Sequence, residues 1–272
     1  MTSARPIGDH LRTWRQRRRM SQLDLASDAE ISTRHLSFVE SGRAQPSRAM
    51  VLHLAERLEI PLRDRNLLLV SAGFAPVFPE RQLEDPALQS ARAAVELVLA
   101  GHEPYPALAV DRHWQLIAAN TALQRLLAGA APKLLGPPLN VLRLSLHPDG
   151  LAPRIVNLAQ WRQHLLERLR RQIDLSADPV LADLFEELRK YPAPTQPGRP
   201  SSGSGGDFAG IVVPFRLLAD GVVLSFFSTT TVFGTPLDIT LSELALEAFF
   251  PADAATAEAL RHLASQQHQR AG

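Results

Sequence analysis

The residues best suited to chemistry gather in one short stretch, SQLDLASDAEISTRHLSFVESG, at positions 21–42. Ser21 and Ser32 are good helix N-caps, because a serine hydroxyl accepts hydrogen bonds from the free N–H groups of a first helical turn. The small Ala26 falls where two helices would touch, and the apolar residues leave the outer face of the second helix free. This spacing predicts a helix–turn–helix whose second helix, at about 33–41, enters the major groove of DNA.

Several side chains of this motif could contact DNA. The start and outer face of the recognition helix would present Thr33, Arg34 and Ser37 to base edges, and Arg34 could bind guanine O6 and N7 bidentately. Helix N-termini and arginines beyond the recognition helix favour phosphate contacts, which we assign to Gln22, Ser32, Arg43 and Arg48. The arginine-rich stretch 15–19 has two interpretations: it contacts DNA, or it is a solvated helix end that favours cations.

The N-terminal segment resembles the Xre/Cro type of repressor helix–turn–helix. Besides 21–42, the resemblance includes GRAQPS and LAERLEIP further on, and it extends over about residues 5–73. The resemblance implies that Glu40 holds the motif together through local hydrogen bonds or an ion pair. Phe38 stands where this family often has a polar residue that contacts a base, so it either touches a thymine methyl group or packs as a partly buried side chain. A plain helical bundle is the alternative for the segment.

Five short helices would position these residues, as in lambda-repressor-like domains. Apolar side chains at helical spacing and N-caps predict helices that start near residues 7, 22, 33, 47 and 62, and Gly42 and Gly73 would end the third and the fifth. In the helix that starts near residue 22 we expect Leu23 and Ala26, with Leu25 beside them, on the apolar side. In the fifth helix the apolar residues are Leu67, Leu68 and Val70.

The second half of the chain mixes strand and helix patterns. After a proline-rich connector at 75–86 we expect helices at 87–100, 121–127, 158–173, from Asp178-Pro179 and at 254–263, and strands at 106–111, 114–119, 208–218, 222–232 and 245–250. Tyr191–Gly206 is a low-complexity loop, and Ala219-Asp220-Gly221 is a hairpin turn. We therefore expect a multi-domain protein: an all-α domain over 1–75, a connector and linking helix over 76–101, an α+β domain with about five antiparallel strands over 102–265, and a disordered tail over 266–272.

Two segments of the second half resemble a known family. PALAVDRHW at 106–114 with IAAN at 117–120 is similar to the opening hairpin of a PAS-like sensor domain. TVFGTPLDITLSEL at 231–244, followed by FFPADAAT at 249–256, resembles the C-terminal signature of MmyB-like regulators. In that family an Xre-type helix–turn–helix precedes a PAS-like ligand-binding domain. The resemblance implies a bacterial one-component transcription regulator that responds to a small molecule.

The residues that could line a ligand pocket are mainly apolar: Leu108, Val110, Leu116, Ile117, Val213, Phe215, Leu224, Phe226 and the segment 139–158. Such walls favour a hydrophobic or amphipathic ligand, and a fatty-acid-like chain is our hypothesis, with Arg143, His147 or Arg154 meeting an acidic head group. For the apolar residues the alternative is ordinary core packing. Asn120 either contacts the ligand or, more simply, caps a helix. Trp161 is most simply a core anchor.

Composition excludes several classes of protein. There is no cysteine, which excludes disulfides, thiolate zinc sites and cysteine nucleophiles. The nine histidines are scattered, and His102-Glu103 is not followed by the second histidine of a metal-binding helix, so we expect no catalytic or metal site. No apolar run approaches the roughly 18 residues of a membrane span, and the N-terminus lacks a secretory signal, so we expect a cytoplasmic protein without a membrane partner.

The net charge of +1 conceals an asymmetry. Residues 1–80 have 12 arginines and 9 acidic residues (+3), whereas residues 81–272 have 17 basic and 19 acidic residues (−2). This points to an N-terminal module that faces an anion. We expect a regulator, not an enzyme, that binds a double-stranded DNA operator as a homodimer and responds to a small hydrophobic ligand. The rival is an antitoxin-like or protein-interaction module that binds its own promoter without a ligand.

Overall fold

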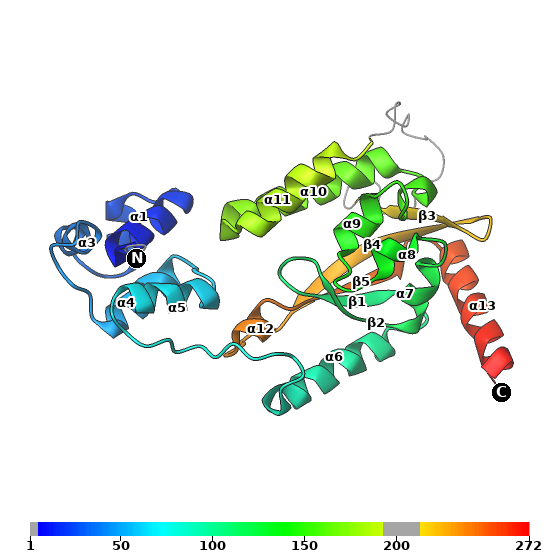
Figure 1. Ribbon diagram of the computed structural model, residues 1–272, viewed down its shortest axis with the longest axis horizontal. Coiled ribbons are helices and arrows are strands. Elements are labelled where there is room, and N and C mark those ends of the chain that lie inside the picture. The colour runs from blue at the N-terminus through cyan, green and yellow to red at the C-terminus, as the bar shows by residue number, and fades with distance from the viewer. Residues whose placement is uncertain (1–4, 193–212, 272) are drawn as a thin grey trace. The chain divides into compact units, whose positions relative to one another are not determined.

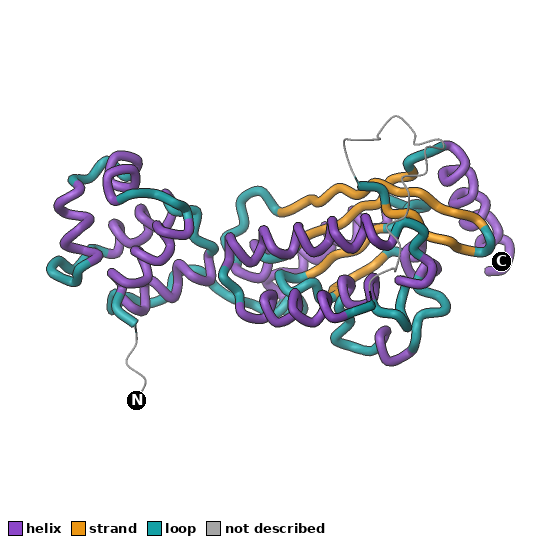
Figure 2. The backbone as a smooth tube through the Cα atoms, turned by 90° about the horizontal axis from the view of Figure 1, so that it is seen from above, coloured by secondary structure: helices purple, strands orange, loops and turns teal. Residues whose placement is uncertain are grey.

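The computed structural model describes residues 5–192 and 213–271, which form two compact units. Unit 1 contains the described residues up to Arg81 together with Asp174–Ser176 and Thr235–Ser242, and unit 2 contains the rest. Figure 1 labels most of the elements of both units, and Figure 2 shows the sheet of unit 2 as orange tubes. None of the described helices is long and apolar enough to cross a bilayer.

Five short helices build unit 1, as the sequence predicted: α1 (Ile7–Arg17), α2 (Gln22–Asp28), α3 (Thr33–Glu40), α4 (Arg48–Arg57) and α5 (Leu62–Ser71). Three of them begin at a serine, because the hydroxyls of Ser21, Ser32 and Ser47 each accept a hydrogen bond from the N–H group three residues later. The core draws on all five helices and includes Leu11, Leu25, Ala26, Leu36, Val39, Leu54 and Leu68.

The inward faces of two helices differ from expectation. Leu23 is 66% exposed, because the helical period turns Leu25 and Ala26 inward and Leu23 away from them. In α5 the inward residues are Leu68 and Leu69, whereas Leu67 and Val70 are each 54% exposed. Placing Leu23, Leu67 and Val70 on the apolar sides of their helices was therefore wrong.

Gly8 permits a close approach between α1 and the C-terminal end of α3. A Cβ atom at this position would lie 2.6 Å from the carbonyl oxygens of both Val39 and Glu40. Real Cβ atoms do not approach backbone oxygens so closely. Glycine is therefore required here by space, and the contact fixes how α1 lies across the helix–turn–helix.

Unit 1 also includes a segment from much later in the chain. Thr235–Ser242, which contains α12 (Ile239–Ser242), lies against the stretch that follows α5. The Ile239 N–H donates to the Pro79 carbonyl oxygen (2.9 Å), the Thr240 hydroxyl donates to the Arg81 carbonyl oxygen (2.5 Å), and Arg81 donates to the Asp238 carboxylate (3.0 Å). We expected the domain to end at residue 75, but the unit continues to Arg81 because these distant residues hold it.

Unit 2 is built on an antiparallel sheet with the strand order β2-β1-β5-β4-β3. The strands are β1 (Ala107–Val110), β2 (Leu116–Ala119), β3 (Phe215–Ala219), β4 (Val222–Val232) and β5 (Ala245–Pro251). Asp220 and Gly221 have positive φ angles of 48° and 79° and form the tight turn between β3 and β4. The sheet confirms the expected α+β, PAS-like fold. Val213 and Pro214 precede β3 rather than belonging to it, and the remainder of the strand expected at 208–218, residues 208–212, lies outside the described residues.

Helices cover both faces of this sheet, as Figure 1 shows for α6 on one side and α10 and α11 on the other. On one face, Val95 and Leu99 of α6 (Gln89–Gly101) pack with Ala107, Ala109 and Leu246. The larger core on the opposite face includes residues from five further helices: α7 (Thr121–Leu126), α9 (Val141–Leu146), α10 (Leu158–Ser176), α11 (Pro179–Lys190) and α13 (Ala254–Ala271). Two short elements, α8 (Pro132–Leu135) and a 3-10 turn at Ala152–Arg154, complete the irregular stretch after α7.

The C-terminal helix is longer than predicted. α13 continues to Ala271, so a helix is present where we expected a disordered tail from residue 266. Its last residues, three glutamines with one histidine, one arginine and one alanine, are compatible with a helix and contain no breaker before Gly272. Of the low-complexity loop expected at Tyr191–Gly206, residues 193–206 lie outside the described residues.

Asn120 joins three elements of unit 2 and is buried. Its Oδ1 accepts hydrogen bonds from the N–H groups of Leu123 (3.1 Å) and Ala107 (3.0 Å), and its Nδ2 donates to the carbonyl oxygens of Tyr105 (2.7 Å) and Leu99 (3.2 Å). All of its hydrogen-bonding capacity is used within the fold. Asn120 is therefore the N-cap of α7 and a link between α6 and β1, which confirms the helix-cap interpretation.

Candidate DNA-binding surface and ligand-binding core

The outer face of α3 presents the side chains predicted to contact bases. Leu36 and Val39 point into the core, so residues 33, 34, 37 and 38 lie on the opposite part of the helix surface. Arg34 is exposed, whereas Thr33, Ser37 and Phe38 are half-buried. Ser32 caps the helix, since its hydroxyl oxygen accepts a hydrogen bond from the His35 N–H (3.1 Å).

A buried ion pair holds α3 in place. The Arg15 guanidinium donates to Glu40 through Nε (2.7 Å) and a terminal nitrogen (2.9 Å), and the Gln22 amide donates to the same carboxylate (2.7 Å). Burial alone would raise the pKa of Glu40, but hydrogen bonds from Arg15 and Gln22 and the charges of Arg15 and Arg12 outweigh it, so the pKa lies below its usual value. The structural role expected for Glu40 is confirmed. Gln22, predicted to contact phosphate, has one amide hydrogen committed to this network.

The arginine-rich end of α1 fits neither of its two interpretations fully. Besides binding Glu40, Arg15 donates to the Met20 carbonyl oxygen (2.9 Å). Arg18 donates to the carbonyl oxygens of Leu58 (2.8 Å) and Glu59 (2.9 Å), at the C-terminal end of α4. These two arginines are therefore used to join helices, whereas Arg17 and Arg19 are exposed.

Two arginines lie close to the Phe38 ring. The guanidinium carbons of Arg34 and Arg43 lie 5.3 Å and 5.9 Å from the centre of its ring. Arg43 is exposed in the turn after α3, and Arg48 is exposed at the first position of α4. The structure thus brings Arg34, Phe38 and Arg43 together, a contact that the sequence interpretation missed although the spacing of four residues between Arg34 and Phe38 indicates it.

Most of the predicted ligand walls meet in the larger core of unit 2. Leu108, Val110, Phe215, Leu224 and Phe226 are buried there, and Leu116 and Val213 pack against them. The ring of Phe215 lies 4.9 Å from that of Trp161, whose indole N–H donates to the Ser145 hydroxyl (3.0 Å), so Trp161 anchors the core as expected. Ile117 is 42% exposed, because successive strand residues face opposite sides and its neighbour Leu116 faces the core. Ile117 was therefore wrong as a wall of this core.

The residues proposed to meet an acidic head group already have partners. Arg143 donates two hydrogen bonds to the Glu187 carboxylate, both at 2.7 Å, and keeps the pKa of Glu187 below its usual value against the opposing effect of burial. The Tyr191 hydroxyl donates to the same carboxylate (2.5 Å). His147 accepts a hydrogen bond at Nδ1 from the Asp149 N–H (2.9 Å), and Arg154 donates to the Leu126 carbonyl oxygen.

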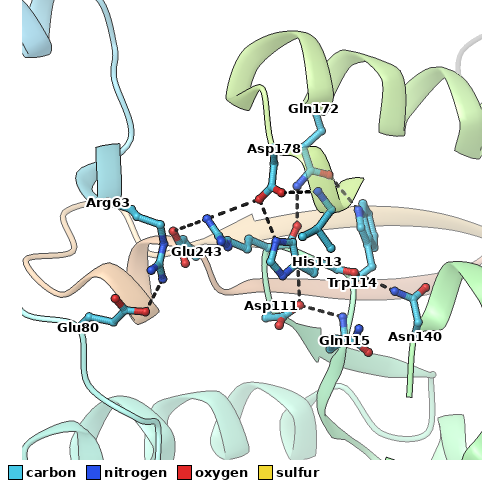
Figure 3. Close-up of polar contacts among 12 residues, drawn as sticks. Arg63, Glu80, Asp111, His113, Trp114, Gln115, Asn140, Gln172, Asp178 and Glu243 are labelled. Carbon is cyan, nitrogen blue, oxygen red and sulfur yellow. Dashed lines mark hydrogen bonds and ion pairs between the residues drawn. The ribbon is translucent and has the colours of Figure 1, made fainter. Parts of the chain in front are cut away.

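A polar cluster in unit 2 was not anticipated from the sequence (Figure 3). The His113 Nε2 lies 2.8 Å from the Asp178 carboxylate, the Trp114 indole donates to Gln172 (2.9 Å), and the Asn140 amide donates to the His113 carbonyl oxygen (2.8 Å). Burial would raise the pKa of Asp178, but the hydrogen bond from His113 and other favourable contacts lower it. The cluster fastens the turn between β1 and β2 to α9, α10 and α11.

A second buried ion pair lies on the sheet. The carboxylate of Glu247 on β5 pairs with Arg168 of α10 and accepts a hydrogen bond from the Thr230 hydroxyl (2.8 Å). Arg168 also lies over the Trp114 ring, 4.5 Å from its centre. Among the described residues, no group of three or more histidines and acids could hold a metal ion. These polar groups thus join elements of the fold.

A five-helix unit with a helix–turn–helix, joined to an α+β unit with a PAS-like sheet, defines a DNA-binding regulator with a ligand-binding domain. Residues 6–68 match a model of a helix-turn-helix domain, and residues 91–263 match the model of the MmyB-like transcription regulator ligand binding domain. Because this second match covers more than half of the chain, the chain belongs to the MmyB-like transcription regulators. Both matched families describe regulators and binding domains rather than enzymes. A comparison with curated proteins found no match.

Proposed function

We propose that this transcription regulator binds its operator through α3 and the arginines around it. The observation that supports this most directly is that some arginines of unit 1 form hydrogen bonds within the fold whereas others are exposed. Arg15 and Arg18 are used inside the fold, whereas Arg34, Arg43 and Arg48 are exposed on α3, the turn after it and the start of α4. Thr33, Arg34 and Ser37 would contact base edges, and Ser32, Gln22, Arg43 and Arg48 would contact phosphates.

We further propose that the regulator is a homodimer, since one helix–turn–helix buries too little surface for useful specificity. The outer face of α6 supports this. Ala94, Leu97 and Val98 follow one another at helical spacing on that face, where Leu97 is 74% and Val98 is 51% exposed. Val95 and Leu99 on the inner face pack on the sheet. A second copy of the chain would cover the apolar outer face.

The ligand that we propose is a hydrophobic or amphipathic molecule such as a fatty acid. The support is the apolar character of the sheet face formed by Leu108, Phe215, Leu224 and Phe226. A carboxylate head group would share Arg143 with Glu187, which accepts two of its five N–H groups, or replace Glu187. Ligand binding would shift the population of conformations of the dimer and so change the spacing of its two recognition helices. We propose that this takes place in the cytoplasm, where the operator lies.

One segment offers a physical path for this effect. The chain leaves β4, whose Leu224 and Phe226 face the core, forms Thr235–Ser242 within unit 1 and then returns to β5. A ligand that displaces β4 or β5 would therefore pull on Thr235–Ser242 and on Pro79 and Arg81, to which it is hydrogen-bonded. The segment is joined covalently to β4 at one end and to β5 at the other, so the effect does not require a chain of side-chain contacts between distant sites.

Denaturing mass spectrometry of organic extracts from the purified protein tests the sensor proposal. We expect a lipid at a stoichiometry near one per chain, and a thermal melting shift when the same lipid is added back. A clean extract, together with no melting shift from a fatty-acid series, would contradict the sensor proposal and favour a ligand-free interaction module that binds its own promoter. Leu224→Asn on β4 should abolish recovery of the lipid, and Val222→Asn, which changes an exposed residue of the same strand, is the matched control.

A further inference from the structure

We propose that Phe38 is a positioning residue, whose ring holds the guanidinium groups of Arg34 and Arg43 in place on the DNA-facing side of α3. The inference rests on the proposed assignment of α3 as the recognition helix. It replaces the two alternatives left open for Phe38, a contact with a thymine methyl group or partly buried packing, with a more specific role: the aromatic ring organises the two charges that make the contacts.

The backbone brings the two arginines to the ring from opposite ends. Arg34 precedes Phe38 by four residues, which places both side chains on one helix face, one turn apart. After α3 the chain turns back at Gly42, whose φ angle is 74°, and the N–H of Arg43 donates to the Phe38 carbonyl oxygen (2.8 Å) while the N–H of Gly42 donates to that of Val39 (3.1 Å). These two bonds form a Schellman motif, which returns Arg43 to the last turn of the helix.

The two guanidinium groups lie 5.3 Å and 5.9 Å from the ring centre, within the range of a cation–π contact. In the part of the chain that the structure describes, neither Arg34 nor Arg43 forms an ion pair with an acid. Arg15 differs, because its charge is neutralised by Glu40. The ring therefore attracts both cations without neutralising them, and their full charge remains available to DNA.

Preorganisation gives the ring its functional value. A free arginine loses side-chain entropy when it is fixed against DNA, and that loss weakens binding. An arginine already held over a ring loses less. Phe38 should therefore raise operator affinity without contacting DNA, and this effect should disappear when the arginines are absent. A ring that instead contacts a thymine methyl group would contribute to affinity whether or not the arginines are present.

The test compares Phe38→Leu, Phe38→Tyr and Phe38→Trp in the full chain and in a background with both Arg34→Ala and Arg43→Ala, on an operator obtained by in-vitro selection. Leucine keeps an apolar side chain but has no ring, and tyrosine and tryptophan keep the ring. We expect Phe38→Leu to weaken binding about five- to thirtyfold, as the loss of two exposed cation–π contacts predicts, and the ring-retaining variants to bind like the wild type. In the arginine-free background, Phe38→Leu should change nothing further.

An equal loss in both backgrounds, or no loss in either, would overturn the proposal. Ring-current shifts of the Arg34 and Arg43 Cδ protons in the DNA-free protein give a second measurement: we expect upfield shifts that disappear in Phe38→Leu, and unshifted protons in the wild type would also overturn it. If Arg34→Ala, Arg43→Ala and Arg48→Ala all leave operator binding unchanged, the assignment of α3 fails. If they weaken binding and Phe38→Leu does not, only the positioning role fails.

Discussion

The Arg15 guanidinium meets the Glu40 carboxylate in a bidentate pair, with donor–acceptor distances of 2.7 Å and 2.9 Å, and so joins α1 to the last residue of α3. Glu40 is only 2% exposed and Arg15 is 9% exposed. Loss of either partner of such a buried pair would leave an unpaired charge in the core. The pair therefore also fixes how α1 lies against α3. The orientation of α3 therefore depends on a contact with α1 on its buried side.

Glu40→Gln should lower the free energy of unfolding by about 3 kcal/mol, because it leaves the Arg15 charge buried without a partner. Urea denaturation followed by circular dichroism measures the change. Glu30→Gln makes the same chemical change at an exposed position after α2 and should stay within about 0.5 kcal/mol of the wild type. Equal stability of Glu40→Gln and Glu30→Gln would show that the pair does not stabilise the unit.

The same pair predicts a pH dependence of stability. Because the pKa of Glu40 is lowered in the folded protein, its contribution is fully present above the pKa of an unfolded glutamate, about 4.3, and is lost as the pH falls through the lower folded pKa. The stability difference between the wild type and Glu40→Gln should therefore shrink steadily below about pH 4.3. Urea titrations at several pH values check this, and a difference that stays constant down to the folded pKa would contradict it.

Gly8→Ala should destabilise unit 1 by about 1–3 kcal/mol, because the new methyl group would collide with the Val39 and Glu40 carbonyl oxygens. Gly101→Ala is the matched control, since a Cβ there meets nothing within 4 Å at the end of α6. We expect that variant to be neutral or up to about 1 kcal/mol more stable. A comparison of chemical denaturation curves decides between the outcomes, and an unaffected Gly8→Ala protein would mean that α1 can move away from α3.

Arg34→Ala and Arg48→Ala should weaken operator binding in different ways. Loss of a base contact at Arg34 should cost about 1–3 kcal/mol on the selected operator and relax the preference at one base pair. Loss of a phosphate contact at Arg48 should weaken binding to all sequences and reduce the salt slope by about one unit. Fluorescence anisotropy over a salt series measures both, with Arg57→Ala, an exposed arginine at the end of α4, as the charge control. Identical profiles for all three variants would contradict the assignment.

The double variant Leu97→Glu, Val98→Glu should convert the proposed dimer to monomers, because charges on the outer face of α6 would have to be buried in the interface. Sedimentation velocity measures the mass. Gln89→Glu with Ser90→Glu adds the same charge at the start of the same helix and should leave the dimer intact. A dimer that persists in the Leu97, Val98 variant would place the interface elsewhere.

Local signals in the sequence were sufficient for most of the helices and strands and for several of the helix caps. Ser32 and Asn120 cap the helices that they were expected to cap, and Asp178 does so for α11, because an N-cap depends only on residues within one turn. The alternation of Leu108 and Val110 likewise predicted a buried strand face. On β2, by contrast, sequence alone did not show which of two adjacent apolar residues, Leu116 or Ile117, faces the core.

Contacts between residues far apart in the sequence could not be predicted from local signals. Arg15 and Arg18 form hydrogen bonds with residues that lie 25 and 40 positions further along the chain, Glu40 and Leu58. The sequence interpretation could not anticipate these partners and treated both arginines as available for DNA or solvent. His113 and Asp178 are 65 residues apart, and nothing in either local pattern indicates the pair. The Phe38 contact with Arg34 is local, but it depends on a side-chain conformation rather than on a backbone preference.

The placement of Thr235–Ser242 in unit 1 limits how the protein can be divided. A fragment that ends at Arg81 would lack Asp238 and Ile239, which are only 4% and 2% exposed in the whole chain, and would expose the surface that they cover. A chimera that joins this N-terminal unit to a foreign sensor would lose the same segment. Exchange of unit 1 of this chain for another therefore requires three separate stretches of sequence, those that end at Arg81, Ser176 and Ser242, to be inherited together, which restrains the recombination of one unit without the other.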